Sequence, residues 1–404
     1  MTSDKSQTMQ DSEPVATRTL TEGESLPCLL THHLGSGHSV SLWRLPDADE
    51  KNLLVNTEGV KFLDEVILEE STPGFVFSPF DNKKPKLFLK GDLIFTFKNG
   101  ALSKESNSYL GSVDPLFQLP ADQKKPSYFF QDDKSCMPTG KNEYTLLVEK
   151  CLTGICDGQF EKVVPSRRQS FALPSDFDLL ATFHALCETY PHAFISLVST
   201  PETGTWIGAT PELLVSIDRH MKFKTVALAG TKVFQPGADM KSIAWTQKDI
   251  EEQALVSRYI INCFKKIRLR EYDEHGPRTS LAGNLIHLET DYEVDMIATN
   301  FPQLGSVMLN LLHPTSAVCG MPLENATKFI KEHEGYDREY YSGYLGPVNL
   351  KNESHIFVNL RCMQVQKTTA WCYAGAGITT DSEPEQEWQE TEMKMNTLLQ
   401  VLNR

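Results

Sequence analysis

The sequence lacks any apolar run near the ~18 residues that a membrane-spanning helix needs. Its N-terminal segment also lacks the charged and apolar regions of a signal peptide. Residues 1–25 are polar, and we expect them to form a disordered tail. These absences predict a protein without a membrane segment, located in the cytoplasm.

Positive charge is also scarce. Lys and Arg number 39 against 53 Asp and Glu residues, which gives a net charge of −14. This balance argues against nucleic acid or an anionic membrane as the main partner. An anionic substrate would therefore need a local basic pocket or a metal ion.

Paired-cysteine motifs are absent as well, because the nine cysteines include no C-x-x-C spacing. The pattern fits a reducing compartment in which most thiols are small core residues. With 40% hydrophobic residues in 404, the chain can bury a large core in about one to three domains.

A segment rich in Pro, Lys, Asp and Gly divides the chain near residues 120–141. We expect residues 26–140 to be the N-terminal scaffold half of one fold and residues 141–404 to carry the chemistry. Strands are expected at residues 40–45, 74–80, 86–89, 92–97, 160–164, 193–199, 205–209, 213–217, 221–228, 285–294, 355–365 and 369–374, and helices at about 144–155, 177–190, 246–270, 304–312, 322–333 and from 382 onward. Runs of neighbouring strands with helices between the runs favour an α+β fold with mostly antiparallel sheet.

The C-terminal helix is expected to begin at Ser382, because Ser382 and Glu385 have the spacing of a capping box. Glu387, Glu390 and Lys394 then share one helix face. Two carboxylates one turn apart are suited to a hard cation such as Mg²⁺, and the lysine to an anionic group. The alternative is a solvated face with an ordinary Glu/Lys pair.

Two further residues are candidates for acid and base chemistry. Strand alternation aims Lys162 at the apolar face of Phe160 and Val164, where burial would lower its pKa and make it a candidate base. The alternative is a lysine that snorkels at a strand edge. Glu212 follows a proline in an apolar setting, where a raised pKa would suit a proton donor, or else it simply begins a helix.

Other candidates are weaker on their own. Gly230 and Thr231 end a strand and could cup a carboxylate or form a plain turn. Glu252 lies in a charged helix face that is solvated by default, and His313 precedes a proline where it could simply cap a helix. Arg361 is expected inside an apolar strand, where it needs an anionic partner, either a structural carboxylate or a substrate.

Eight segments follow one another along the second half as EKVVPSRR, GATPELL, LAGT, KDIEEQALV, HPTSAVCG, REYYSGYLGPV, FVNLRC and AGAGITTDSEPEQEWQETEMK. In order and approximate spacing they resemble the chorismate-utilising enzymes, which include isochorismate, salicylate, anthranilate and aminodeoxychorismate synthases. The resemblance is strong over residues 141–404 and weak before them. It implies that family's α+β fold, with mostly antiparallel sheets in the core and helices outside, and a chorismate-binding catalytic region at 141–404.

The resemblance also implies roles for individual residues. Members that add water carry a lysine at the position of Lys162, so this residue would be the base that activates water. Glu212 would be the acid that protonates the departing C4 hydroxyl of chorismate. Ala229 stands where aminodeoxychorismate synthases carry a nucleophilic lysine, so that covalent intermediate is excluded.

By the same resemblance, Glu252 and Glu390 would ligate Mg²⁺, with Glu387 nearby through water. The substrate-binding positions implied are Gly230, Thr231, His313, Ala317, Tyr341, Arg361, Gly375, Ala376, Gly377 and Lys394. Two residues depart from the family pattern. Thr210 stands where the family usually has a serine, and Gln253 stands where it often has a histidine. Neither departure removes a catalytic group.

The implied activity is that of an isochorismate synthase, a Mg²⁺-dependent isomerase that adds water at C2 and loses the C4 hydroxyl. The alternative is salicylate synthase, which goes on to eliminate pyruvate, but Ala317 disfavours it because those enzymes tend to carry threonine there. Anthranilate synthase component I is disfavoured by Lys162 and by the absence of glutaminase-like sequence. An inactive binding protein is disfavoured because every acid, base and metal position is filled.

We expect chorismate as the small-molecule partner, no glutaminase subunit, and a monomer or weak homodimer. The product would enter a menaquinone, siderophore or salicylate pathway.

Overall fold

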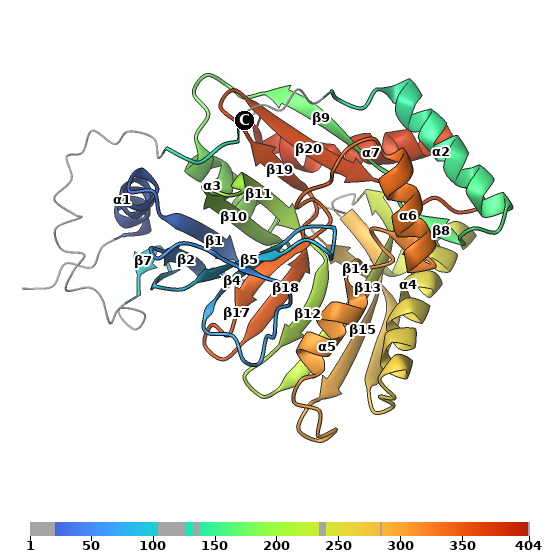
Figure 1. Ribbon diagram of the computed structural model, residues 1–404, viewed down its shortest axis with the longest axis horizontal. Helices are drawn as coiled ribbons and strands as arrows, with labels where there is room; N and C mark the ends of the chain where they lie inside the picture. Colours follow the sequence, from blue (N-terminus) through green and yellow to red (C-terminus); the bar gives the residue numbers. More distant parts are fainter. Residues whose placement is uncertain (1–20, 104–126, 132–136, 234–239, 283–284, 403–404) are drawn as a thin grey trace, which may run out of the picture.

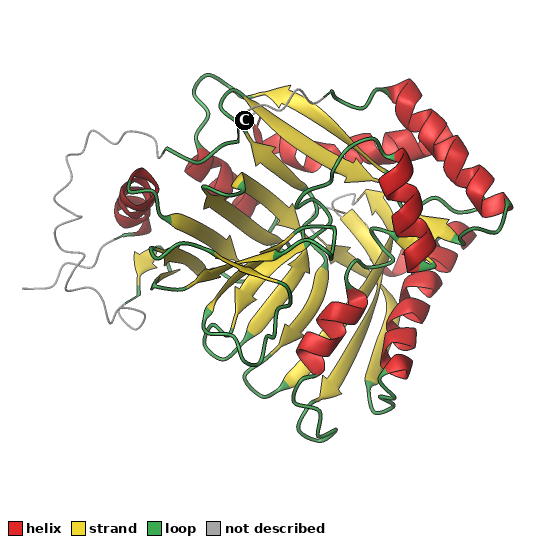
Figure 2. Ribbon diagram, in the orientation of Figure 1, coloured by secondary structure: helices red, strands yellow, loops and turns green. Residues whose placement is uncertain are grey.

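A computed structural model describes residues 21–103, 127–131, 137–233, 240–282 and 285–402. Two nine-stranded sheets occupy the centre of the molecule, and helices lie around them (Figures 1 and 2). Neighbouring strands pair antiparallel within both sheets. The α+β fold with mostly antiparallel sheet, predicted from the sequence, is confirmed.

The first sheet combines strands from both ends of the chain. In spatial order it consists of β7 (Ala101–Leu102), β6 (Leu93–Lys98), β2 (Lys51–Asn56), β1 (Ser39–Arg44), β10 (Phe194–Thr200), β11 (Gly204–Thr210), β19 (Cys362–Val365), β20 (Thr369–Gly375) and β9 (Ser166–Ala172).

The second sheet is likewise assembled from distant segments. It consists of β14 (Asp273–Ala282), β15 (Leu285–Asp295), β13 (Lys222–Val233), β12 (Leu213–Ile217), β18 (Ser354–Val358), β17 (Tyr344–Val348), β4 (Gly74–Ser78), β5 (Lys86–Lys90) and β3 (Lys61–Leu63). A separate pair joins β8 (Lys162–Val163) to β16 (Gly320–Met321). Strands from the first 140 residues enter both large sheets, so this part shares one fold with the rest.

The two sheets pack face to face through aromatic side chains. Phe194 of β10 stacks on Phe357 of β18 with ring centroids 4.2 Å apart, which joins the first sheet to the second. Along β1, Trp43 belongs to this inner core, whereas Leu42 belongs to the core beneath the outer helices. Because successive strand residues point to opposite faces, both faces of the first sheet are buried.

Seven α-helices lie outside the sheets in the described residues. Helices α1 (Glu22–Gly35), α3 (Leu179–Thr189) and α7 (Pro384–Leu402) share a core with the first sheet, and α4 (Gln247–Lys266) and α5 (Leu304–Leu312) with the second. Helices α2 (Lys141–Cys156) and α6 (Leu323–His333) contribute to a smaller core that Trp388 of α7 also contacts. None of the helices in the described part of the chain has the length and apolar character needed to cross a membrane.

The expected disordered tail at residues 1–25 is partly wrong. Residues 1–20 lie outside the described residues, but Thr21 caps α1, which begins at Glu22. Thr21 and Glu24 form a capping box, with the Glu24 backbone N–H donating to the Thr21 hydroxyl. Buried Leu26, Leu29 and Leu30 hold this helix against the sheet, so packing outweighs the polar character of its first turn.

The strand expected at residues 355–365 is also wrong, because it is two strands in two different sheets. The chain leaves β18 in the second sheet and enters β19 in the first, and Arg361 lies in the bend between them. Its backbone has a left-handed φ of 48°, which no regular strand can contain. The bend aims Arg361 into the region between the sheets instead of a core strand.

Candidate active site

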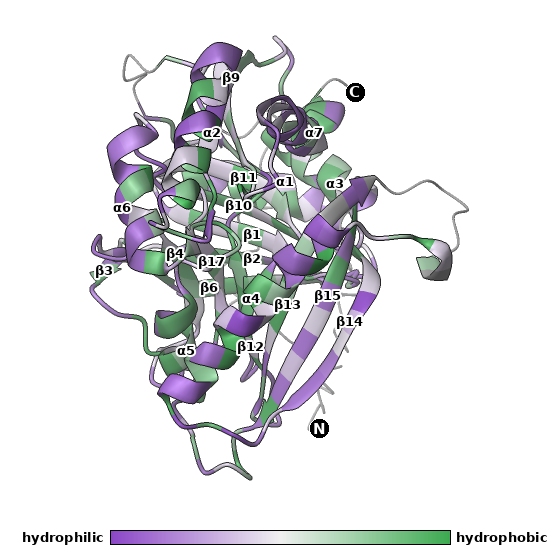
Figure 3. Cartoon of the chain, turned by 90° about the vertical axis from the view of Figure 1, so that its right-hand side faces the viewer, coloured by the Kyte–Doolittle hydropathy of each residue, from purple (hydrophilic) through white to green (hydrophobic). Residues whose placement is uncertain are grey.

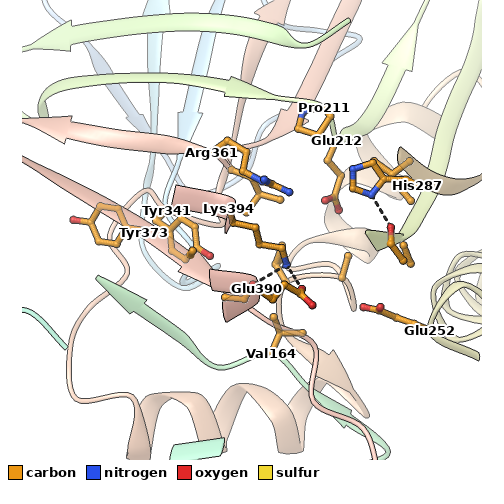
Figure 4. A pocket seen from close by; sticks show the side chains of 18 residues that line it. Val164, Pro211, Glu212, Glu252, His287, Tyr341, Arg361, Tyr373, Glu390 and Lys394 are labelled. Atoms are coloured by element: carbon orange, nitrogen blue, oxygen red, sulfur yellow. Dashed lines mark hydrogen bonds and ion pairs between the residues drawn. The ribbon is translucent and has the colours of Figure 1, made fainter. Parts of the chain in front are cut away.

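A cavity lies where strand ends from both sheets meet α4 and α7 (Figure 4). All of its lining residues fall between residues 164 and 394, so none of the described residues before Val164 lines it. The lining consists of Val164, Pro211, Glu212, Leu228, Ala229, Gly230, Glu252, His287, Ala317, Val318, Tyr341, Leu360, Arg361, Tyr373, Ala374, Gly375, Glu390 and Lys394.

Lys162 contacts this cavity through Glu252. Its Nζ lies 2.8 Å from Oε1 of Glu252, which α4 presents from the other side. Only 1% of the Lys162 side chain is exposed, so the predicted burial is confirmed and the snorkelling alternative is wrong. Burial raises the pKa of Glu252, but the charges of Lys162 and Lys394 and the hydrogen bond from Lys162 outweigh it and lower that pKa to about 2. Glu252 is therefore a carboxylate at neutral pH.

Glu212 stands on the link between β11 and β12, and it begins no helix. Burial raises its pKa to about 7, although the charges of Lys162, Lys394 and Arg361 oppose the rise. A carboxyl group near half protonation at neutral pH can both give and take a proton. Thr210, which replaces the usual serine, keeps its hydroxyl bonded to the Val358 carbonyl at 2.7 Å and supports the same turn.

Arg361 projects its guanidinium into the cavity (Figure 4). Its closest polar contact is a 3.3 Å hydrogen bond to the Thr397 hydroxyl. The ion pairs of the described residues include none to Arg361. Of the two partners considered for this arginine, a structural carboxylate is therefore not found, and an anionic ligand fits the geometry.

Each of the three candidate metal-binding acids is held by its own lysine. Glu252 pairs with Lys162 at 2.8 Å, and Glu390 pairs with Lys394 at 2.6 Å. Lys394 also donates to the Gly375 carbonyl at 2.8 Å, which ties α7 to the glycine-rich end of β20. The three acids thus come from two helices, and a positive charge accompanies each of them.

The third acid, Glu387, is 1% exposed and pairs with Lys248 at 2.6 Å. Burial and the nearby Glu390 raise the pKa of Glu387. Its Oε2 is buried without a hydrogen-bond partner among the described residues. No three His, Cys, Asp or Glu side chains of the described chain stand together as a formed metal site, but a buried orphan oxygen beside a second acid suits a divalent cation.

Gly230 lies in a bulge of β13 and not at a strand end as expected. The register with β15 shifts between Ala229 and Lys232, and Gly230 has a φ of 66°. The Nδ1 of His287 lies 2.8 Å from the Gly230 carbonyl oxygen. Burial and the charge of Arg361 lower the pKa of His287 to about 3, so its ring is neutral.

Sequence reasoning missed His287 as a lining residue. The available signal was a histidine within the apolar run Leu285–Leu288 of an expected strand. Tyr373, which also lines the cavity, carried no separate signal, because buried aromatic residues are common in any core.

Several expected substrate-binding residues do not line the cavity. His313 caps the end of α5, with its Nε2 3.2 Å from the Pro79 carbonyl oxygen, so the capping alternative is found. Ala376 is buried in the core beneath α2 and α6. Gly377 lies beside Lys162 and Glu252. The side chain of Thr231 is not among the side chains that the structure describes.

The cavity brings together two fixed cations, a glutamate that titrates near neutral pH and a lysine–glutamate pair. Arg361 and Lys394 can bind carboxylates, since both are donors without acceptor capacity. Glu212 can exchange protons with a bound molecule at neutral pH. This set suits proton-transfer chemistry on a small anionic substrate.

Comparisons with known proteins agree with this chemistry. A family described as chorismate binding enzyme matches residues 105–403. The Vibriobactin-specific isochorismate synthase of Vibrio cholerae is 30% identical over 331 residues, which cover 80% of this chain and 78% of that enzyme.

Isochorismate synthase EntC of Escherichia coli is 29% identical over 248 residues, or 60% of this chain. That match spans 62% of the length of the relative, which is less than two thirds. Among solved structures, MenF, the menaquinone-specific isochorismate synthase of Escherichia coli, has a TM-score of 0.73 at 22% identity and covers 94% of this chain and 91% of that one. The structural likeness shows that the fold is shared.

Proposed function

The chain belongs to the family of chorismate binding enzymes, and from this premise we propose that it is an isochorismate synthase, an isomerase that converts chorismate to isochorismate. One observation carries the proposal: Glu212, with a pKa of about 7, lines the same cavity as Glu252, which pairs with buried Lys162. The relatives named above as isochorismate synthases support the same reaction.

Chorismate carries two carboxylates, so its binding needs positive charge in an otherwise acidic protein. The ion pairs of the described residues include none to Arg361, and its guanidinium can bind one carboxylate through two N–H groups. Lys394 and Gly375 also line the cavity. These contacts would orient the ring between Lys162 and Glu212.

The proton transfers balance without an outside reagent. A water oxygen bonds to C2 of the ring while Lys162 takes a proton from that water. The ring double bonds shift and the C4–O bond breaks, and Glu212 gives its proton to the departing oxygen, which leaves as water. One water enters and one leaves, so substrate and product are isomers.

Mg²⁺ is part of the proposal. Glu252, Glu387 and Glu390 would hold it, and the orphan Oε2 of Glu387 supports that assignment. When bound, the ion would neutralise the ring carboxylate of the substrate. The enzyme would work in the cytoplasm without a glutaminase subunit, and isochorismate would pass to a menaquinone, siderophore or salicylate pathway.

The test is incubation of the purified protein with chorismate and Mg²⁺, followed by chromatographic separation of the products and a coupled assay for pyruvate. We expect a mixture of chorismate and isochorismate, with pyruvate no higher than in the enzyme-free control. Lys162→Gln is the inactive control, with a loss of at least ~100-fold in turnover. Enzymatic pyruvate and salicylate would show a salicylate synthase instead, and absence of turnover would refute the proposal.

A further inference from the structure

A second buried charge cluster lies behind the cavity wall. Arg338, between α6 and β17, and Glu334, at the end of α6, have side chains that are each 2% exposed. The guanidinium binds the carboxylate through two hydrogen bonds, from Nε to Oε2 and from Nη2 to Oε1, both 2.7 Å long. Neither residue lines the cavity.

The remaining hydrogen bonds of Arg338 go to the backbone of the cavity wall. Nη1 donates to the Val318 carbonyl at 2.8 Å, and Nη2 donates to the Val164 carbonyl at 2.7 Å. Val164 and Val318 both line the cavity. A single side chain therefore joins two wall segments that are more than 150 residues apart in sequence.

Both segments carry groups that the proposed reaction uses. Val164 follows Lys162 by two residues, and Val318 follows Ala317 directly. The Val164 backbone N–H also donates to the Cys319 carbonyl at 2.9 Å, so the two segments are bonded side by side. A shift of these carbonyls would therefore reach the end of β8, the strand that carries Lys162.

Glu334 extends the same network to the start of β9. Its Oε1 accepts hydrogen bonds from the Ser166 backbone N–H at 2.5 Å and from the Ser166 hydroxyl at 2.6 Å. Burial lowers the pKa of Arg338, but the charge of Glu334 and its hydrogen bonds outweigh burial and raise it, so the cation persists. A buried ion pair is often no more stabilising than apolar residues of the same volume. Stability alone therefore does not account for the hydrogen bonds from Arg338 to the Val164 and Val318 carbonyls.

We propose that Arg338, held by Glu334, is a positioning residue for the reaction: it fixes the Val164 and Val318 carbonyls and thereby the placement of Lys162 and of the wall at Ala317. This inference rests on the proposed function. It assigns Arg338 a role in turnover and not in substrate binding.

The experiment compares Arg338→Met, Arg338→Lys and the double variant Glu334→Leu/Arg338→Met with the wild-type enzyme. Arg338→Met should lower kcat about 10- to 100-fold, because small misplacements of a reacting group cost that much, with KM for chorismate within about threefold. It should also lower Tm, because Glu334 is left as an unpaired buried charge. Arg338→Lys cannot span both carbonyls and should give an intermediate kcat.

The double variant separates positioning from stability. It removes both charges, so Tm should return toward the wild-type value while kcat stays low. Arg258→Met is the control, because Arg258 forms an exposed ion pair with Glu161 and should leave kcat unchanged. Recovery of both Tm and kcat in the double variant would overturn the proposal.

Amide hydrogen exchange does not depend on enzyme activity, so it tests the positioning role of Arg338 separately from the proposed isochorismate synthase function. Amide hydrogen exchange in residues 162–166 and 316–320 should be faster in the double variant than in the wild-type protein. An inactive wild-type protein would refute the isochorismate synthase proposal, while unchanged exchange in both segments would refute the positioning role of Arg338.

Discussion

At the residue scale, burial acts on the two groups that we propose as acid and base, Glu212 and Lys162. The carboxyl group lies on a strand link where burial raises its pKa to about 7. The lysine lies on a short strand against the Glu252 carboxylate, 1% exposed. The apolar neighbours of both residues predicted their burial, while an ordinary surface position stayed an open alternative for each. It could not reveal that Glu212 and Glu252, the partner of Lys162, line one cavity, because strand ends from two sheets meet two helices there.

The pH dependence of turnover follows from this pair. During the reaction Glu212 gives up one proton and Lys162 gains one. The two residues together therefore hold the same number of protons before and after the reaction. Because the pKa of Glu212 is about 7, a further proton is bound at this site below that pH, and the form with one proton is lost as pH falls. We expect kcat/KM to fall tenfold per pH unit well below pH 7.

The pH profile of kcat/KM should be the same for the forward and the reverse reaction, because chorismate and isochorismate carry the same number of protons. Glu212→Gln should abolish both directions together. The measurement is initial rates from chorismate and from isochorismate between pH 5 and 8. A flat profile below pH 7, or a variant at Glu212 that loses one direction only, would contradict the acid–base assignment.

The candidate metal ligands yield a second residue-scale prediction. Glu387→Gln or Glu390→Gln should weaken Mg²⁺ binding at least about tenfold and abolish turnover, because a carboxylate ligand is lost. Calorimetric titration with Mg²⁺ measures the first effect without an activity assay, and circular dichroism checks that each variant is folded. Glu385→Gln is the matched control on the same helix, since Glu385 is 57% exposed and pairs with Lys141. Full activity in excess EDTA would refute the metal requirement.

At the element scale, α7 and the loop before it organise the site. The expected capping box at Ser382 is wrong, because the Ser382 hydroxyl accepts from the Thr379 backbone N–H and the helix begins at Pro384. The prediction that Glu387, Glu390 and Lys394 share one helix face does not depend on where the helix begins. It depends only on their spacing in sequence, because an α-helix has 3.6 residues per turn. Helix phase could therefore be predicted where the helix boundary could not.

Gly377 in this loop provides an element-scale test. A Cβ added there would lie 2.8 Å from Oε1 of Glu252 and 2.9 Å from Cε of Lys162, so alanine must displace the pair. Its φ lies outside the left-handed region, so alanine fits the backbone. Gly377→Ala should lower kcat about 10- to 100-fold without unfolding the protein.

The matched control is Gly23→Ala, an exposed helical glycine with no atom within 4 Å of its added Cβ. It should leave kcat unchanged. Wild-type turnover in Gly377→Ala would show that the loop does not hold the lysine and glutamate in place.

At the scale of the whole molecule, local patterns predicted the class of fold but not its assembly. Most expected strands are found, because their apolar alternation is strong. Strand β14 was missed because its sequence is mostly polar and exposed, as Figure 3 shows at the edge of the second sheet. The crossing at Arg361 was also missed, because the apolar run from Phe357 to Cys362 has no break that local sequence would reveal.

The conversion of chorismate to isochorismate by attack of water is tested most directly by isotope labelling. Chorismate is incubated with the enzyme and Mg²⁺ in water enriched in oxygen-18, and the isochorismate formed is analysed by mass spectrometry before the reverse reaction becomes appreciable. If Lys162 activates water for attack at C2, the new hydroxyl takes its oxygen from the solvent, and isochorismate should carry the label at C2 in proportion to the enrichment. Unlabelled isochorismate would show that the hydroxyl moves within the substrate and would contradict the account.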